Sequence, residues 1–263
     1  MNDGLARLGQ RWRTAVRRPR DVAAVLLATA RTGWRPGQWP APAREVLARQ
    51  VLFTGIESLR FILLAGLAVG LAVVLQAKVW LDKFGQSDMV GPLLVAVIIR
   101  EIGPLLVNFI VIGRSGTAIA SELSMMRVRG EVDLLDAQGI DPFLYLARPR
   151  VLGVGLAVFG LTVCFIPAAL FSGYLAGRLL GLPVGPLDLF AQSVFRAVSP
   201  ADIFNLLAKT WLPGMATGAL CCLEGLSVRG AFTEVPQAAT RGVVQSVGAL
   251  FLIFALVSVL TYL

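Results

Sequence analysis

Two adjacent charged residues, Arg100 and Glu101, stand in a long apolar stretch and are followed by Gly103 and Pro104. A charge at the centre of a bilayer costs about 2.5–3.5 kcal/mol on insertion scales, so such residues are buried in a bundle, paired, or turned to a wet cavity. Neighbouring helix positions point about 100° apart, so we expect each residue to find its own partner on another helix or in a polar cavity. The pair could form a pathway or gating site, or a structural ion pair that locks the bundle.

Several other kinds of chemistry are excluded by residues that the sequence lacks. It has no histidine and no Gly-Lys dipeptide, which removes histidine metal sites, histidine-dependent nucleophilic triads and a Walker A phosphate loop. Cys164, Cys221 and Cys222 lie in apolar runs without CxxC spacing, which favours a packing role. We therefore expect no catalytic residue, no metal and no cofactor held by this chain.

The elements that must position Arg100 and Glu101 are membrane helices. The 263 residues are 56% hydrophobic and 15% charged, against about 45–50% and 25% in soluble domains. Apolar stretches long enough to cross about 30 Å of hydrocarbon predict an all-α polytopic membrane protein with five spans, at 59–81, 89–113, 151–177, 203–223 and 242–263. Arg100 and Glu101 then fall near the middle of the second span.

The arginines predict the orientation of these spans. Residues 1–50 hold ten arginines and three acidic residues, and the 114–150 loop holds five more arginines. The loops at 82–88 and 178–202 hold three basic residues between them. An excess of positive charge marks the cytoplasmic side, so we expect the N-terminus inside and the C-terminus outside. The basic segment could also contact anionic lipid headgroups, and we expect no nucleic-acid binding.

Residues 1–58 precede the five-span domain at 59–263, and we expect them to form cytoplasmic or interfacial helices. The start of the chain fits a signal peptide loosely, but its apolar run is short, which favours an interfacial helix. Ala43–Ser58 alternates charged and apolar residues, a pattern typical of a helix lying in the membrane surface. Prolines at 36, 40 and 42 predict a break between the two helices.

Three shorter patterns complete the prediction. Small residues around Gly113 and Gly116 permit close approach between membrane helices. Residues 128–139 alternate charged and apolar side chains and end in a glycine, which predicts a short cytoplasmic helix, either a docking site for a partner or a solvated connector. Trp80 and Phe84 at the outer end of the first span could belong to an interfacial aromatic belt or line an acyl-chain path.

From about Arg49 to the C-terminus, the sequence resembles the MlaE/YrbE permease family, the membrane subunits of lipid-transporting ABC systems that work with MCE proteins. The resemblance rests on motifs in register along four fifths of the chain: Arg49-Gln50, Gly55, Ser58-Leu59, Gln76, Arg100-Glu101-Ile102-Gly103-Pro104, Gly113-Arg114-Ser115-Gly116, Ala120-Ser121-Glu122-Leu123, Met126, Glu131-Val132-Asp133, Gly139-Ile140-Asp141-Pro142 and Pro149-Arg150. An arginine–glutamate pair inside a span, followed by a Gly-rich turn, is hard to obtain by chance.

This resemblance implies a homodimer of five-span subunits in the inner membrane of a double-membraned bacterium. It implies a cytoplasmic ABC ATPase that binds the ATP, an MCE-domain protein on the periplasmic side, a STAS-domain accessory, and phospholipid as cargo. It makes 128–139 the coupling helix that rests on the ATPase, with the coupling residues Arg129, Glu131, Asp133, Leu134, Asp136, Gly139 and Asp141. The implied lipid path is Val73, Trp80, Leu81, Phe84, Arg100 and Glu101, and the structural motif is Gly113, Arg114, Gly116 and Glu122.

Some positions depart from the family pattern. The segment Val235-Pro236-Gln237-Ala238-Ala239-Thr240 replaces a Val-Gly-x-Ala-Thr-Thr pattern, and Phe254 stands where the family has an acidic residue. Gly130-Glu131 replaces the usual Glu-Gln. Two other functions stay open on the sequence: an ion-coupled secondary transporter that uses Arg100 and Glu101 as a relay, and a membrane scaffold that transports nothing. The first would predict repeated halves, and the sequence shows no internal repeat.

Overall fold

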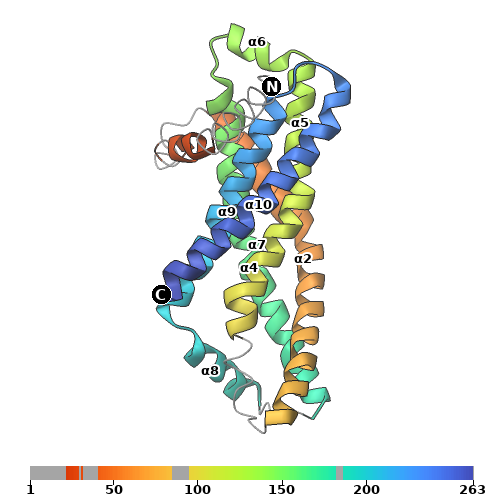
Figure 1. Cartoon of the computed structure of the whole chain (residues 1–263), viewed down its shortest axis with the longest axis vertical. Helices are drawn as coiled ribbons and strands as arrows, with labels where there is room; N and C mark the ends of the chain where they lie inside the picture. The colour runs from red at the N-terminus through yellow and green to blue at the C-terminus, as the bar shows by residue number, and fades with distance from the viewer. Residues whose placement is uncertain (1–21, 30, 32–40, 85–94, 182–185, 263) are drawn as a thin grey trace, which may run out of the picture.

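The computed structural model describes residues 22–29, 31, 41–84, 95–181 and 186–262. In these residues the backbone forms helices and turns, with no strand. Five helices are long and apolar enough to cross a membrane: Pro42–Ala77, Ala96–Val128, Phe143–Leu179, Pro200–Leu226 and Phe232–Thr261. They pack side by side as an elongated bundle, with α6 (Glu131–Ala137) at one end and α8 (Leu187–Ala197) at the other (Figure 1). The prediction of five membrane helices is confirmed.

The first long helix, α2 (Ala41–Phe84), differs from the prediction. It joins the expected interfacial segment 43–58 and the expected first span in one helix of 44 residues. Pro42 lies in its first turn, where a missing N–H breaks no helical hydrogen bond. No proline follows it within α2, so nothing in the sequence ends the helix between the two segments. The expected proline break at 36 and 40 lies outside the described residues.

The second membrane helix is a continuous rod built from four segments: η3 (Val95–Ile102), α4 (Gly103–Val111), η4 (Ile112–Gly116) and α5 (Thr117–Val128). Both η segments are π-helices, which occur mostly as local bulges, frequently at functional sites. One contains Arg100 and Glu101 and the other contains Gly113 and Arg114.

One expectation about this rod is wrong. The Gly-rich stretch after residue 112 is not a turn, because its backbone keeps right-handed helical dihedrals through Thr117. Gly116 serves close packing instead, since a Cβ atom on it would lie 3.1 Å from the Cys221 sulfur. Within the described residues the membrane-length helix runs from Ala96 to Val128, so Arg100 lies in its first turns, and part of the predicted span, 89–94, lies outside those residues.

The third to fifth membrane helices are α7 (Arg148–Leu179, after the π-helix η5, Phe143–Ala147), α9 (Pro200–Leu226) and α10 (Val235–Tyr262, after the 3-10 turn η6, Phe232–Glu234). Local signals set their ends. Gly181 takes a φ of 72° just after α7, as a C-terminal glycine does. At the start of α9, Ser199 and Asp202 form a reciprocal capping box around Pro200.

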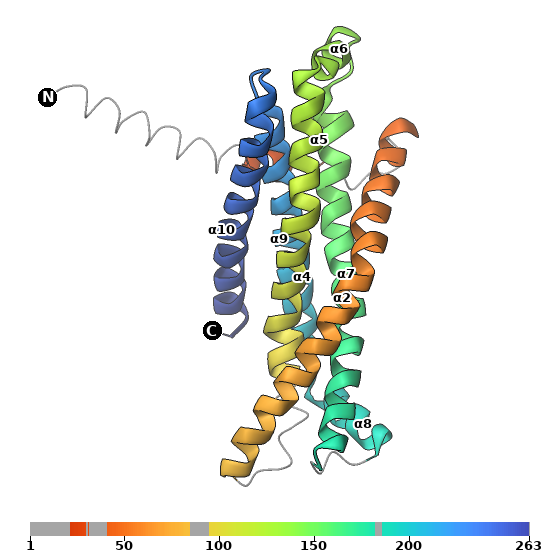
Figure 2. The same ribbon diagram turned by 90° about the vertical axis from the view of Figure 1, so that its right-hand side faces the viewer.

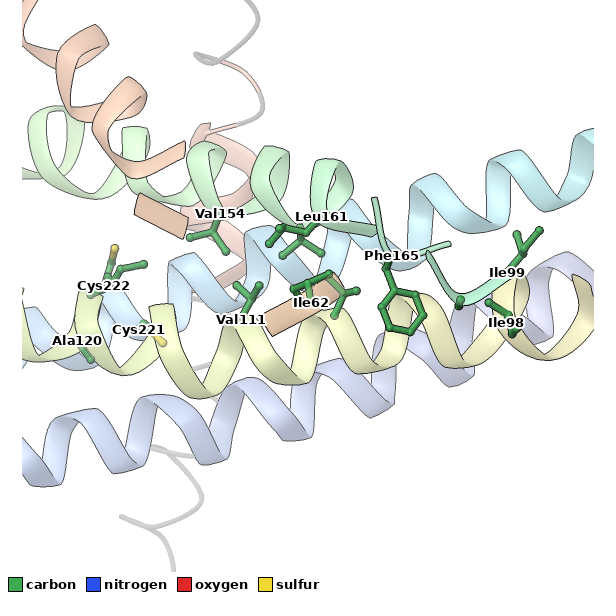
Figure 3. Packing of buried hydrophobic residues seen from close by; sticks show 14 of the residues in the cluster. Ile62, Ile98, Ile99, Val111, Ala120, Val154, Leu161, Phe165, Cys221 and Cys222 are labelled. Atoms are coloured by element: carbon green, nitrogen blue, oxygen red, sulfur yellow. The ribbon is translucent and has the colours of Figure 1, made fainter. Parts of the chain in front are cut away.

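Glycines bring the long helices close together, as Figure 2 shows for α2 and α7. A Cβ atom on Gly70 would lie 1.9 Å from the Ala169 carbonyl oxygen of α7, and one on Gly218 would lie 2.8 Å from the Cα of Val151. Phe165, which is fully buried, fills the centre of the core with Ile62, Ile98 and Leu161 (Figure 3). The main hydrophobic cluster therefore lies along α7, which packs against α2, α4 and α9, whereas α10 packs against α9 and α5.

Candidate functional site

Arg100 finds its partner on α9. Its Nε lies 2.7 Å from Oδ1 of Asp202, and Nη2 donates a hydrogen bond to Oδ2 at 3.1 Å. Asp202 is only 2% exposed, and its carboxylate also accepts hydrogen bonds from the backbone and hydroxyl of Ser199. The residue that caps α9 therefore also fixes Arg100, and the start of α9 is tied to the π-helix η3.

Glu101 is paired with Lys209, two turns farther along α9. The Lys209 ammonium donates to Glu101 Oε1 at 2.5 Å and to the Arg100 carbonyl oxygen at 3.1 Å. It also lies 5.2 Å from the ring centroid of Phe254 on α10, a favourable cation–π arrangement. The Lys209 side chain is fully buried, whereas 49% of the Glu101 side chain is exposed. The four residues Arg100, Glu101, Asp202 and Lys209 form what we call the charge cluster.

A groove lies beside the charge cluster, between α2 and the η3–α4 part of the rod. Its volume is about 610 Å³, and it opens at the surface of the chain. Among the described residues, Gln76 is the one polar lining residue, and the others are Val69, Ala72, Val73, Ala77, Val97, Ile102, Leu105 and Leu106. An apolar groove of this kind suits a hydrocarbon chain.

The structure places one of the sequence-predicted path residues in the lining of the groove. Val73 lines the groove, and Arg100 and Glu101 immediately precede its lining residue Ile102. Trp80, Leu81 and Phe84 belong to the last turns of α2, but their side chains lie outside the described residues.

The structural-motif residues form a second polar region on the α6 side of the charge cluster. Arg114, in the π-helix η4, donates to Ser58 Oγ at 2.6 Å and forms an ion pair with Glu57, both on α2. Glu122 on α5 accepts a hydrogen bond of 2.8 Å from Arg150 on α7. These pairs tie the rod to its two neighbours, and Gly113 leaves open space around its Cα.

The segment expected to face a partner forms α6 at the tip of the bundle. Left-handed glycines flank it, with φ values of 75° at Gly130 and 74° at Gly139. Val132 is buried, whereas 61% of Leu134 is exposed. The other expected residues form its polar contacts. The side chain of Asp133 pairs with Arg127, and a carboxylate oxygen of Glu131 lies 3.7 Å from the Arg129 guanidinium. The backbone carbonyl of Asp136 accepts a hydrogen bond from the Gly139 N–H, and the carboxylate of Asp141 accepts one from the Phe143 N–H.

Two members of the charge cluster, Asp202 and Lys209, were not identified as site residues from the sequence. Lys209 is the single charged residue in the predicted fourth span, 203–223. An isolated charge in a span requires an opposite charge, so it could have been matched with Glu101. Asp202 stands just outside that predicted span, in a segment that reads as a helix cap.

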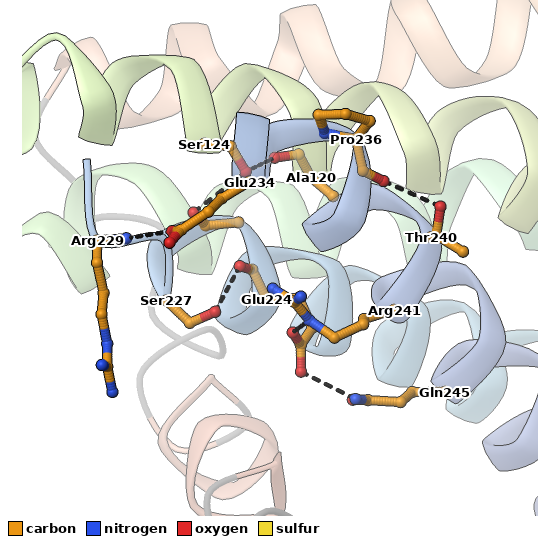
Figure 4. A network of polar contacts seen from close by, with 11 residues as sticks. Ala120, Ser124, Glu224, Ser227, Arg229, Glu234, Pro236, Thr240, Arg241 and Gln245 are labelled. Atoms are coloured by element: carbon orange, nitrogen blue, oxygen red, sulfur yellow. Dashed lines mark hydrogen bonds and ion pairs between the residues drawn. The ribbon is translucent and has the colours of Figure 1, made fainter. Parts of the chain in front are cut away.

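A further polar network, also missed, joins α9 to α10 at the α6 end. Glu224 is 5% exposed and accepts hydrogen bonds of 2.9 Å from both Arg241 Nε and Gln245 Nε2 (Figure 4). Arg241 lies just before the predicted fifth span, and nothing in its local sequence indicates which acidic residue it meets.

Replacing Glu224 by alanine is expected to lower the free energy of unfolding by about 2 kcal/mol, because it leaves two donors at the α9–α10 contact without their acceptor. Thermal unfolding of the full chain in detergent measures the change. Glu45→Ala is the control, because Glu45 forms an exposed i,i+4 pair with Arg49 that is worth only about 0.3–0.5 kcal/mol. Equal effects of the two substitutions would contradict a structural role for the Glu224 network.

Comparison with known proteins shows which family this chain belongs to. The family model described as "Permease MlaE" matches residues 47–260. Protein TRIGALACTOSYLDIACYLGLYCEROL 1, chloroplastic, from Arabidopsis thaliana is 31% identical over 205 residues, which cover 78% of this chain and 58% of that protein. This chain therefore spans less than two thirds of the length of the chloroplast relative.

Bacterial relatives match over a larger share of their length. A probable ABC transporter permease protein from Rickettsia prowazekii is 29% identical over 206 residues, 77% of each chain. The intermembrane phospholipid transport system permease protein MlaE from Haemophilus influenzae is 28% identical over 203 residues, which cover 76% of this chain and 77% of that protein. The family match covers all five membrane helices, and the chain belongs to the MlaE permease family, whose members are non-catalytic membrane subunits of ABC transporters.

Proposed function

We propose that the protein moves phospholipid between the inner membrane of a double-membraned bacterium and an MCE-protein conduit, driven by ATP hydrolysis in a partner subunit. The observation that carries the proposal is the apolar groove of about 610 Å³ beside the charge cluster. An acyl chain fits the aliphatic lining of this groove. The relative from Haemophilus influenzae, named as a phospholipid transport permease, supports the same cargo.

A homodimer agrees with the exposure of Glu101 in the single chain. Half of this carboxylate side chain is exposed, and Glu101 lies in a helix that is long and apolar enough to cross a membrane. A charge facing hydrocarbon is costly. A second copy placed over the groove would cover both Glu101 and the lipid path, and would make the cavity a shared one.

Coupling to ATP hydrolysis is proposed to run through α6. The helix is short, lies at the tip of the bundle, and combines an exposed leucine, Leu134, with ion-paired charged residues around it. A cytoplasmic ATPase would dock on this face, with the N-terminus on the same side and the C-terminus on the periplasmic side. An MCE-domain protein would receive or deliver lipid at the opposite end, and a STAS-domain accessory would join on the cytoplasmic side.

Filling the groove tests the proposed path. Ala72 lines the groove on α2, and Ala72→Trp places an indole in the space proposed for an acyl chain. We expect the variant to fold, to keep its ATPase partner, and to lose most of its co-purifying phospholipid and its ATP-dependent transfer of fluorescent phospholipid between liposomes.

The matched control is Leu64→Trp. Leu64 is also on α2 and is 65% exposed, but it does not line the groove. This variant should retain both lipid and transfer. Normal transfer by the folded Ala72→Trp complex would contradict the proposed path.

A further inference from the structure

The helix that carries Lys209 is interrupted by a proline. Pro213 lies inside α9, and in a regular α-helix the N–H at position 213 would donate to the carbonyl oxygen of Lys209. Proline has no N–H, so position 213 cannot supply the hydrogen bond that this carbonyl would accept in a regular α-helix. Both residues are buried in the bundle. A buried carbonyl oxygen without a donor is destabilising, so the fold must supply one from elsewhere.

The missing donor is Asn108 on α4. Its Nδ2 donates to the Lys209 carbonyl oxygen at 3.1 Å and to the Pro104 carbonyl oxygen at 2.7 Å. Its side chain is 1% exposed. Because both acceptors are carbonyl oxygens, only the NH₂ end of the amide can face them, which fixes the orientation of the side chain.

We propose that Asn108 is a positioning residue that clasps the proline break in α9 and thereby aims the Lys209 ammonium at η3. The inference rests on the proposed function of the groove and its charge cluster. Lys209 is held at both ends, its carbonyl oxygen by Asn108 and its ammonium by Glu101 and the Arg100 carbonyl oxygen. Asn108 and Glu101 belong to one continuous rod, so the rod forms hydrogen bonds with both the backbone and the side chain of Lys209. A change in how α9 sits against the rod must then move Lys209 relative to the groove.

The clasp predicts a specific rescue. Asn108→Leu has a similar volume but no donor, so it leaves the Lys209 carbonyl oxygen unpaired. Pro213→Ala restores an N–H that can pair that oxygen within α9, which makes Asn108 dispensable. We expect Asn108→Leu to lower the melting temperature of the detergent-solubilised full chain by about 2–4 °C. In the Pro213→Ala background the same substitution should lower it by less than half as much.

A matched control uses a proline in the interior of another membrane helix. Pro167 lies inside α7 and is exposed, so Pro167→Ala restores a helical N–H in a helix that does not carry Lys209. It should not reduce the cost of Asn108→Leu. If Asn108→Leu alone gives no folded protein, recovery of folded protein by Pro213→Ala is the expected result. A double variant that also fails to fold, or an undiminished cost of Asn108→Leu beside Pro213→Ala, would overturn the clasp.

A second readout separates positioning of Lys209 from stability alone. In the complex with its ATPase, reconstituted in liposomes, Asn108→Leu should slow phospholipid transfer by between about twofold and thirtyfold. It should add little to the loss caused by Lys209→Met, because both act through the same ammonium. Independent, multiplicative losses would reject the positioning role. If the wild-type complex transfers no lipid, the proposed function fails, while the melting experiment still decides whether the clasp exists.

Discussion

Replacing Glu101 by leucine is expected to destabilise the protein by about 3–5 kcal/mol, as the removal of one partner from a buried ion pair does. The reason is the burial of its partner. Lys209 is fully buried, so removal of the Glu101 carboxylate leaves an ammonium inside the bundle without a counter-charge. The Arg100 carbonyl oxygen and the Phe254 ring remain near it, but neither carries a formal charge.

The reverse substitution, Lys209→Met, is expected to cost less. It leaves Glu101 behind, and half of that side chain is exposed, so the remaining charge is the easier one to solvate or to cover. The double variant Glu101→Leu/Lys209→Met should be more stable than Glu101→Leu alone, because it removes both charges. Thermal unfolding of the four proteins measures this order. A Lys209→Met variant less stable than Glu101→Leu would contradict the assigned burial of the pair.

Replacing Gly70 by alanine is the second change with a large expected effect, a loss of about 3 kcal/mol. An added Cβ atom would lie 1.9 Å from the Ala169 carbonyl oxygen and 2.2 Å from the Ser172 Oγ. The first of these is a backbone atom, so no side-chain rotation relieves the overlap and α2 must separate from α7. Because α2 and η3–α4 form the two walls of the groove, the same shift should also reduce the amount of bound lipid.

Gly55→Ala is the matched control on the same helix. An added Cβ atom there would meet nothing within 4 Å, and alanine is favoured over glycine inside a helix by about 0.5–1 kcal/mol. This variant should therefore melt at the same temperature as the wild type or slightly above it. If Gly70→Ala behaves as Gly55→Ala does, the close contact between α2 and α7 is not part of the native packing.

Much of the fold could be predicted because membrane helices can be recognised from long runs of apolar residues. Five apolar runs predict the five helices, and the glycines at 130 and 139 delimit α6. The boundaries were less predictable. Residues 114–128 contain a glycine and charged residues, yet they continue the second helix, because Arg114 donates to Ser58 and Gly116 packs against α9.

Only two of the four residues of the charge cluster, Arg100 and Glu101, could be predicted from the sequence. Arg100 and Glu101 are conspicuous because they interrupt an apolar run, but their partners are 102 and 108 residues away. Such pairings arise when helices pack, and no local pattern encodes them. The same holds for Asn108, whose role depends on a proline in another helix.

The most direct test of the account is to purify the native protein in mild detergent and identify the co-purifying proteins and lipids by mass spectrometry. The account predicts an ABC ATPase, an MCE-domain protein and phospholipid in stoichiometric amount. The ATPase should be lost from a Leu134→Arg variant, which alters the exposed face of α6, while the phospholipid is retained. A protein that purifies alone, with neither ATPase nor phospholipid, would contradict the claim that this chain is the lipid-carrying subunit of an ATP-driven transporter.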